Sequence, residues 1–409
     1  MGNALEVYDF TSYAFFAVMI GNAFFPAHDK LVSLLLSLAT FGIGFLSRPL
    51  GGILIGAYAD RAGRRPAMML SFVLMGLGSA ALALTPAYAT IGIAAPLIII
   101  VARLIQGFAL GGEIAPATAF MLEAADPARR GLFGSLQSAS QGVATFGSGM
   151  VGLALALSLS ADQMNTWGWR VPFLLGSLIL PLGIIIRRSL PETLHHPEAG
   201  ETVRKVSFAE LMRTHGRTVV LGFLIISSLT IPFYVFTYLT TYAIVTLHMN
   251  TTVSLAATAV LGFCNIVFSI PGGWLSDRIG RKPVMIAQRI VLALCAYPLF
   301  KLLNVFPVAM MLFSVTAMLS FLNAPGNAVA LVAVTESLAK SVRCASLGTI
   351  YALAVAIFGG TTQFIIAWLI AWTGDPLAPA WYLTAALTVG IVAMAMLRET
   401  APALVSKPH

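Results

Sequence analysis

The chain has 409 residues, of which 58% are hydrophobic and only 10% are charged, and its formal net charge is +8. Its mean hydropathy is +0.88. A soluble domain carries about 25% charged residues, so a soluble chain of this length would have too few charges to cover its surface. The composition therefore excludes a soluble enzyme, a disordered protein and a nucleic-acid binder as leading interpretations. It favours a chain whose surface lies largely in lipid.

Twelve apolar stretches are long enough to cross a bilayer, which takes about 20 residues in a helix. In chain order they cover residues 5–25, 32–57, 66–85, 91–122, 131–158, 168–187, 217–247, 252–275, 283–303, 307–334, 344–372 and 377–397. The long polar stretch 188–216 divides them six and six. We therefore predict an all-α polytopic membrane protein with an N-terminal half (1–187), a cytoplasmic central loop (188–216) and a C-terminal half (217–409).

Lysine and arginine gather on one side of this predicted topology. The segments after the even-numbered spans hold nearly all of them, whereas the opposite side holds Lys30 and Lys301. By the positive-inside rule the basic side is cytoplasmic, so both termini are expected inside, and the net charge is explained. No cleavable signal peptide is visible and no Lys or Arg precedes Lys30, so we expect a trimmed or misassigned start.

Residues for cofactor or catalytic chemistry do not form a recognisable arrangement in the sequence. Cys264, Cys295 and Cys344 are scattered and lack the spacing of metal ligands. No nucleotide-phosphate loop and no Ser/His/Asp arrangement is convincing. We therefore expect no metal, no cofactor and no enzymatic activity.

One loop sequence occurs twice. Residues 56–66 and 273–283 share the pattern G-x3-D-R-x-G-R-[R/K]-P after spans two and eight, at an offset of 217. A second repeat follows spans four and ten, where Glu123 precedes Arg130, and Glu336 precedes Arg343, by seven positions. Matched loops at equivalent positions are typical of two six-span halves related by duplication, as in a parallel-repeat transporter.

Over its whole length the chain resembles the major facilitator superfamily of transporters, whose cytoplasmic signature is similar to the doubled loop. The resemblance implies two pseudo-symmetric six-helix bundles. It also implies that the charged residues of the loops form inter-helix contacts that gate the inward face. The gate residues expected from the loops and the second repeat are Gly56, Asp60, Arg61, Gly63, Arg64, Glu123, Arg130, Gly273, Asp277, Arg278, Gly280 and Arg281.

Four further strings resemble the metabolite:H+ symporter family. They are GNALEVYDF (2–10), FLSRPLG (45–51), RLIQGFALGGE (103–113) and WGWRVPF (167–173). That family includes carriers for citrate, 2-oxoglutarate, shikimate and zwitterionic osmolytes. The short strings at 233–234, 358–360 and 373–375 look most like the citrate and tricarballylate carriers. The chain departs from the family in lacking the usual basic segment before the first span.

Ionisable residues inside spans indicate function by default, because a charge in lipid is costly. Glu6 and Asp9 are three apart on one face of the first span. Two neighbouring carboxylates in a low dielectric tend to share a proton. Glu6, Asp9 and Glu113 are the predicted proton-coupling residues, with Asp9 preferred as the deeper of the first two. A salt bridge from Asp9 to Arg48 or Arg103 is the structural alternative.

Arginine and amide side chains within the spans are candidates for anion binding. Arg103, near the middle of the fourth span, is suited to grip a carboxylate with two hydrogen bonds. The full set of predicted substrate-binding residues is Arg103, Arg48, Gln106, Gln137, Tyr234, Asn265 and Asn327. Helix-to-helix hydrogen bonding is the alternative for the uncharged residues. Arg289 is close to Lys282 and is expected to snorkel to the inner surface.

Together these observations predict a secondary active transporter of a bacterial-type inner membrane. It would carry a small organic anion, citrate or a related tricarboxylate, with protons by alternating access. The expected partners are the anion, protons and the lipid bilayer, with no nucleic acid and no obligate protein partner. The alternatives are a proton symporter for 2-oxoglutarate, shikimate or a zwitterionic osmolyte, an exporter or exchanger, and a non-transporting membrane sensor with a transporter fold.

Overall fold

The computed structural model describes residues 2–62, 64–111, 118, 121–122, 125–188, 208–338 and 343–401, and these residues are mostly helical. The first part of the chain forms α1 (Gly2–Phe15), α2 (Ala17–Phe24), α3 (Lys30–Leu46), α4 (Arg48–Ala62), α5 (Arg64–Leu84), α6 (Tyr88–Ile91), α7 (Ala94–Leu110), α9 (Arg130–Ser158), α10 (Ala161–Thr166) and α11 (Val171–Arg188). The second part forms α12 (Phe208–Val245), α13 (Thr251–Ile279), α14 (Arg281–Val305), α15 (Ala309–Ser337), α16 (Arg343–Ala354), α17 (Gly360–Thr373) and α18 (Ala378–Met396). A π-helical turn (Val355–Gly359) links α16 to α17.

The described residues contain nine helical segments that are long and apolar enough to cross a membrane. Two of these segments run through a helix break, namely Lys30–Tyr58 in α3–α4 and Ser346–Thr373 in α16–α17. With the pair α1–α2, with α7 and with α11, they account for the twelve predicted spans. Helix α12 begins at Phe208, inside the predicted central loop, although its apolar segment begins at Gly216.

In the part of the chain that the structure describes, the first, second and eleventh predicted spans each contain a break. The first bends at Phe16, the second at Ser47, and the eleventh at the π-helical turn. Pro49 follows the second break and has no backbone N–H to donate to the helix. Such irregular turns in long helices often lie at functional sites. Residues beside all three breaks line the pocket described below.

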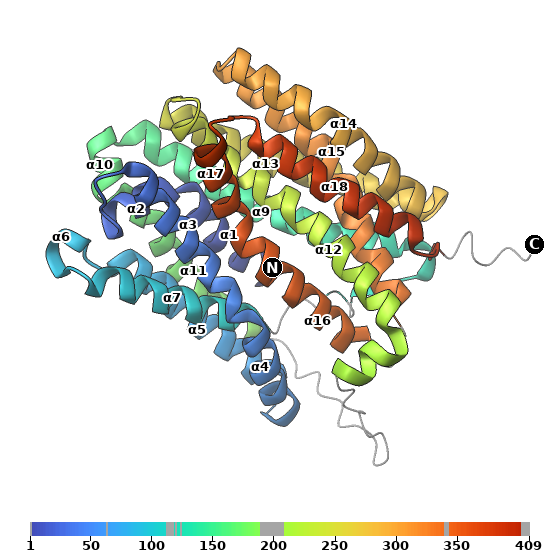
Figure 1. Ribbon diagram of the computed structural model, residues 1–409. Helices are drawn as coiled ribbons and strands as arrows, with labels where there is room; N and C mark the ends of the chain where they lie inside the picture. The colour runs from blue at the N-terminus through green and yellow to red at the C-terminus, as the bar shows by residue number, and fades with distance from the viewer. Residues whose placement is uncertain are drawn as a thin grey trace, which may run out of the picture.

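The helices form two groups along the chain. Figure 1 shows α1–α11, coloured blue to green, on one side and α12–α18, coloured yellow to red, on the other. Helix α9 packs along α13 where the groups meet, and α3 packs on α17. Glycine makes the first contact possible, because a Cβ atom on Gly273 would lie 2.3 Å from the carbonyl oxygen of Gly131.

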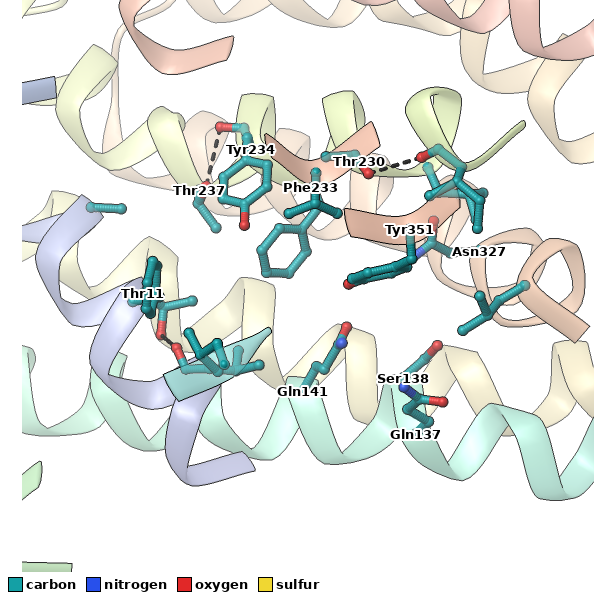
Figure 2. Close-up of a pocket in the computed structure, with 18 of the residues that line it drawn as sticks. Thr11, Gln137, Ser138, Gln141, Thr230, Phe233, Tyr234, Thr237, Asn327 and Tyr351 are labelled. Atoms are coloured by element: carbon teal, nitrogen blue, oxygen red, sulfur yellow. Dashed lines mark hydrogen bonds between the residues drawn. The ribbon is translucent and has the colours of Figure 1, made fainter. Parts of the chain in front are cut away.

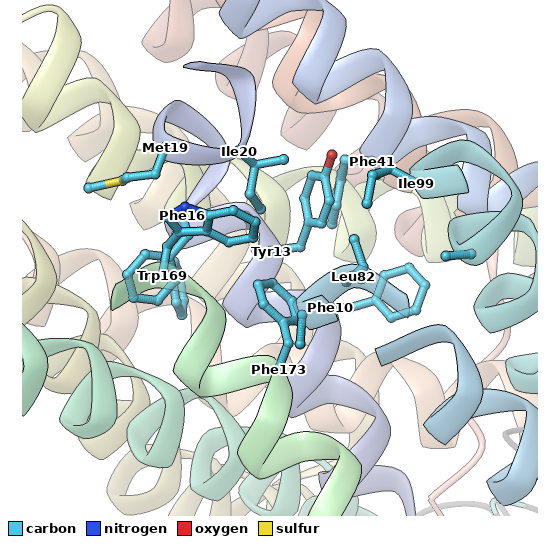
Figure 3. Packing of buried hydrophobic residues seen from close by; sticks show 14 of the residues in the cluster. Phe10, Tyr13, Phe16, Met19, Ile20, Phe41, Leu82, Ile99, Trp169 and Phe173 are labelled. Carbon is cyan, nitrogen blue, oxygen red and sulfur yellow. The ribbon is translucent and has the colours of Figure 1, made fainter. Parts of the chain in front are cut away.

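Aromatic side chains fill the core of the first group (Figure 3). The rings of Tyr13 and Phe41 stack with centroids 5.8 Å apart, and Phe10 meets Phe45 edge-on at 5.1 Å. Aromatic pairs of this kind stabilise a core beyond the burial of their area. Their faces also carry partial negative charge, so this core can hold cations.

Candidate functional site

A pocket lies between the two helix groups (Figure 2). Helices α1, α3, α4, α7 and α9 line one side, and α12, α15, α16 and the π-helical turn line the other. The polar lining residues are Thr11, Arg48, Gln137, Ser138, Gln141, Thr230, Tyr234, Thr237, Asn327 and Tyr351. Arg48 is the one charged residue among the described residues of the wall. An apolar cavity with a few convergent polar groups and one cation is suited to a small anion.

Arg48 lies at the first position of α4, directly after the break in the second span. Its side chain is buried, and its guanidinium carbon lies 4.2 Å from the ring centroid of Phe45 and 4.8 Å from that of Phe10. Among the described residues no carboxylate pairs with it, and its Nε has no hydrogen-bond partner. A buried cation without a counter-ion is costly, so a bound anion would stabilise it.

Asp9 and Arg103 form a buried ion pair behind the pocket wall. Arg103 Nη1 lies 3.7 Å from Asp9 Oδ2. Gln106 bridges the two groups, because its Nε2 donates to Asp9 Oδ2 at 2.6 Å and its Oε1 accepts from Arg103 Nη1 at 2.7 Å. Ser79 Oγ donates to Asp9 Oδ1 at 2.7 Å. The Asp9 carboxylate is therefore held by one cation and two neutral donors.

Aromatic rings enclose the guanidinium of Arg103, which is 0% exposed. Its central carbon lies 4.2 Å from the ring centroid of Phe10, 4.3 Å from Tyr13 and 5.4 Å from Phe41. Cation–π contacts of this kind are strongest where water is excluded. Phe10 thus contacts the guanidinium groups of both Arg48 and Arg103, and its ring lines the pocket, whereas Asp9 and Arg103 are not part of the lining.

The predicted substrate residues fall into two groups in the structure. Arg48, Gln137, Tyr234 and Asn327 line the pocket, and Figure 2 shows the last three among its side chains. Arg103 and Gln106 lie behind the wall with Asp9 instead of in the lining. Asn265 is also absent from the described lining; it is partly exposed on α13, and its carbonyl accepts a hydrogen bond from Ser269. Glu113 and the side chain of Glu6 lie outside the described part of the chain.

Sequence reasoning missed Phe10 and Ser79. Phe10 is one of 25 phenylalanines, and only its position between two cations distinguishes it. Ser79 is a small polar residue in an apolar helix, where it ordinarily bonds to its own backbone, as it also does here to Met75. Its nearness to Asp9 depends on how α5 packs against α1, which the sequence pattern does not specify.

Arg289 is buried deep in the second helix group. Its side chain is 0% exposed, with Nη1 donating to Asn323 Oδ1 at 2.5 Å and Nη2 to Asn327 Oδ1 at 3.1 Å. The expectation that Arg289 snorkels to the inner surface is therefore wrong. Its face of α14 packs against α15, which supplies both amide acceptors.

The second copy of the repeated loop joins the two helix groups at one end. Asp277, near the end of α13, accepts hydrogen bonds from the backbone N–H groups of Gly131 (2.8 Å) and Leu132 (2.9 Å) at the start of α9. A carboxylate here caps the helix and stabilises its positive N-terminal dipole. Arg281 reaches Asp277 at 2.6 Å and Glu336 at 3.3 Å. Helices α13, α14 and α15 of the C-terminal half thus meet α9 of the N-terminal half at a single cluster.

Comparison with known proteins agrees with this architecture. Residues 7–361 match the model of the Major Facilitator Superfamily. The chain belongs to this superfamily. It is 38% identical over 403 residues to the citrate-proton symporter of Salmonella typhi, covering 97% of this chain and 92% of that one. It is 31% identical over 418 residues to the proline/betaine transporter of Salmonella typhimurium, covering 98% and 82%.

Solved structures give the same fold. The crystal structure of a D-xylose-proton symporter superposes with a TM-score of 0.78 at 19% identity, covering 98% of this chain and 96% of that one. The predicted twelve-helix superfamily fold is therefore confirmed. So is the prediction that the chain is a multi-pass membrane transporter and not an enzyme.

The remaining residues of the superfamily loops differ in their contacts. Gly280, between α13 and α14, has φ +105°, a conformation that glycine adopts without strain. Arg278 is exposed, with its guanidinium 3.9 Å from the ring centroid of Trp274. Arg130 Nε donates to the carbonyl of Leu122 at 3.0 Å. Among the predicted charged gate residues whose side chains the structure describes, only Asp277 and Arg281 therefore contribute to the inter-half cluster.

The first copy of the loop gives less detail. A Cβ atom on Gly56 would meet no other atom within 4 Å. Gly63 and Glu123, with the side chains of Asp60, Arg61 and Arg64, lie outside the described part of the chain. Their assignment to the gate stays a prediction.

Proposed function

We propose that this transporter is a proton-coupled symporter of a small organic anion, citrate or a related tricarboxylate. The observation that carries the proposal is that one ring, that of Phe10, contacts the guanidinium groups of two buried arginines. On the pocket side, Arg48 has no carboxylate partner among the described residues. On the core side, Arg103 is paired with a carboxylate that can take up a proton. The similarity to a citrate-proton symporter supports citrate and protons as the transported species.

In this proposal Arg48 is the principal ligand of the anion. Its planar guanidinium is suited to a carboxylate, and the aromatic rings against it fix its position. Neutral donors line the same pocket, since Gln137, Gln141 and Asn327 have amide groups and Tyr234 points its hydroxyl into the pocket (Figure 2). These groups can satisfy the remaining oxygen atoms of a bound polycarboxylate.

Coupling to protons follows from the charge of Asp9. An ionised Asp9 neutralises Arg103, whereas a protonated Asp9 leaves that cation uncompensated beside the pocket. The two guanidinium carbons lie 4.8 and 4.2 Å from the same ring centroid, so they are at most about 9 Å apart. At an effective dielectric near 20, a unit positive charge on Arg103 at that distance would change the free energy of anion binding at Arg48 by about 2 kcal/mol. This corresponds to about a 30-fold change in affinity for the anion.

The proton and the anion therefore favour each other's binding. The linkage is reciprocal, so an anion at Arg48 also favours protonation of Asp9. Arg103 and Gln106 transmit the change rather than contact the anion, because Gln106 bonds to both charges. Glu6 and Glu113 remain further candidates for proton coupling.

Alternating access requires the cytoplasmic contacts to break and re-form as the halves rock. The Asp277 cap on α9, together with the Arg281–Glu336 pair, is the proposed inner gate on this side. Substrate and proton can shift that equilibrium only by binding the two states differently. The proposed location is a bacterial inner membrane with both termini cytoplasmic, as the basic loops indicate.

Proteoliposomes test the proposal directly. Labelled citrate uptake is measured with and without an inward proton gradient, for the wild type, Arg48→Ala and the exposed-residue control Lys301→Ala. We expect gradient-driven accumulation in the wild type and the control, and its loss in Arg48→Ala. Equal accumulation without the gradient would remove the coupling role of Asp9. Uptake of betaine but not citrate would mean that the substrate is a zwitterionic osmolyte. Citrate binding without transport would support a membrane sensor.

A further inference from the structure

Arg289 is a buried cation with no counter-ion among the described residues. Its guanidinium donates to two neutral amides, Asn323 and Asn327, and its Nε has no partner in the described part of the chain. By contrast, Arg103 has Asp9. A buried, unpaired charge destabilises the fold unless something compensates it. Within the described residues of the second half, the positive charge of Arg289 is therefore not balanced by a carboxylate.

Asn327 connects this charge to the pocket. The two amide partners of Arg289 are one helical turn apart on α15, but only Asn327 belongs to the described lining. A guanidinium has donors only, so it turns the amide oxygen of Asn327 toward itself. The Nδ2 group of Asn327 then remains to donate hydrogen bonds into the cavity. The charge of Arg289 lies one side chain behind it.

We propose that Arg289 is a positioning residue that makes the pocket selective for anions with more than one carboxylate. It orients Asn327 as a donor and places a second positive charge on the C-terminal side of the cavity, while Arg48 supplies the first on the N-terminal side. This inference rests on the proposed function. A polycarboxylate can meet both charges at once, whereas a monocarboxylate meets one.

Asn323 and Asn327 provide a matched pair of variants. Each replacement by Ala removes one hydrogen bond to the same guanidinium, but Asn327→Ala also removes a donor from the cavity. We expect Asn327→Ala to weaken citrate binding about tenfold, the usual effect of losing a charge-assisted bond, and Asn323→Ala by less than about threefold. Arg289→Gln should weaken citrate binding at least about tenfold, and Arg289→Lys should restore part of the loss.

The experiment measures equilibrium binding of labelled citrate to the purified full-length chain in nanodiscs, with competition by succinate and by lactate. The preference for citrate over lactate should fall in Arg289→Gln and Asn327→Ala and persist in Asn323→Ala. A purely structural role would lower binding of all three acids in proportion, which would overturn the inference.

Two other results are decisive. If the wild type binds citrate and Asn323→Ala and Asn327→Ala behave alike, Arg289 only supports the fold, and the proposed function survives. If the wild type binds betaine and no carboxylate, the proposed function fails, and this inference fails with it. Should Arg289→Gln not fold, the two asparagine variants still decide between these outcomes.

Discussion

Two buried arginines, Arg103 and Arg281, sit in networks of opposite character, although both side chains are 0% exposed. Every nitrogen of the Arg281 guanidinium has an oxygen acceptor: Nε and Nη2 reach Glu336, and Nη1 reaches Asp277 and Ser276. Arg103 has acceptors for Nη1 alone, and among the described residues its Nε and Nη2 have none. One network is saturated and the other is not.

The difference indicates different tasks. A saturated network resists any change, because removing one member leaves a buried charge unpaired. The Arg281 network is therefore suited to a gate contact that is either fully formed or fully broken. The Asp9–Arg103 pair, enclosed by aromatic rings, changes its net charge when Asp9 binds one proton, and no second ion pair is lost. It is suited to sensing the proton.

Replacing Asp9 by Asn should produce the largest effect. The amide keeps the shape and one of the two acceptor oxygens that Ser79 and Gln106 use, but it cannot exchange a proton, and Arg103 stays uncompensated. We expect gradient-driven citrate accumulation to fall to background while citrate/citrate exchange across the membrane continues and loses its pH dependence. Ser79→Ala, which removes one neutral donor, is the control and should retain accumulation. Persistent accumulation in Asp9→Asn would exclude Asp9 as the coupling residue.

Arg48→Ala should produce the next largest effect, this time on binding. Loss of a charge-assisted contact costs about 1.5–3 kcal/mol, so citrate affinity should fall about 10- to 100-fold. Arg48→Lys should recover part of that loss, because a lysine keeps the charge but cannot bind a carboxylate bidentately. Binding is measured on purified protein in nanodiscs. An unchanged affinity would show that the anion binds elsewhere.

The sequence predicted the spans and the duplicated loops well, because both depend on local composition. A bilayer requires about 20 apolar residues per helix whatever the helix packs against. The pairing of Asp9 with Arg103 was foreseen only as an alternative, because it depends on how α1 and α7 are rotated. The same limitation applies to Asn265, which is not part of the described pocket lining; its role at the substrate stays a prediction.

Arg289 shows the limit most clearly. Its closeness to Lys282 in sequence favoured the inner surface, and only tertiary packing contradicts this. Its side chain faces α15, where Asn323 and Asn327 accept its hydrogen bonds. The packing of α14 against α15 therefore buries Arg289. Which face of one helix packs against another is not visible in hydropathy.

Weakening the proposed inner gate, which consists of the Asp277 cap on α9 and the Arg281–Glu336 pair, should have a moderate effect. Asp277→Asn weakens the cap on α9 and removes one of the two carboxylate partners of Arg281, leaving Glu336. Loss of a cap costs about 0.5–2 kcal/mol, which should lower the midpoint of thermal unfolding. A cysteine introduced at the buried Ser135, with the native cysteines replaced, should then react faster with a maleimide. Equal labelling rates with and without Asp277→Asn would show that this contact does not hold the cytoplasmic side closed.

The smallest effect is expected at Glu399, which extends the saturated network beyond the last helix. Its carboxylate accepts hydrogen bonds from the backbone N–H groups of Arg281 (2.9 Å) and Lys282 (3.0 Å) at the start of α14. Partial burial raises the pKa of Glu399, but the backbone hydrogen bonds from Ala401, Lys282, Arg281 and Thr400 outweigh it and hold the pKa below its usual range.

A lowered pKa in the folded state means that the ionised form stabilises the fold. This contribution is complete above the ordinary pKa of a glutamate, near 4.3, and is lost as the pH falls through the lower folded value. Glu399→Gln should therefore lower stability at pH 7 by less than about 1 kcal/mol, since the half-buried group is partly screened. The wild type and the variant should converge as the pH is lowered from about 5 to 3 in thermal unfolding experiments. A constant difference across that range would mean that the Glu399 charge does not stabilise the start of α14.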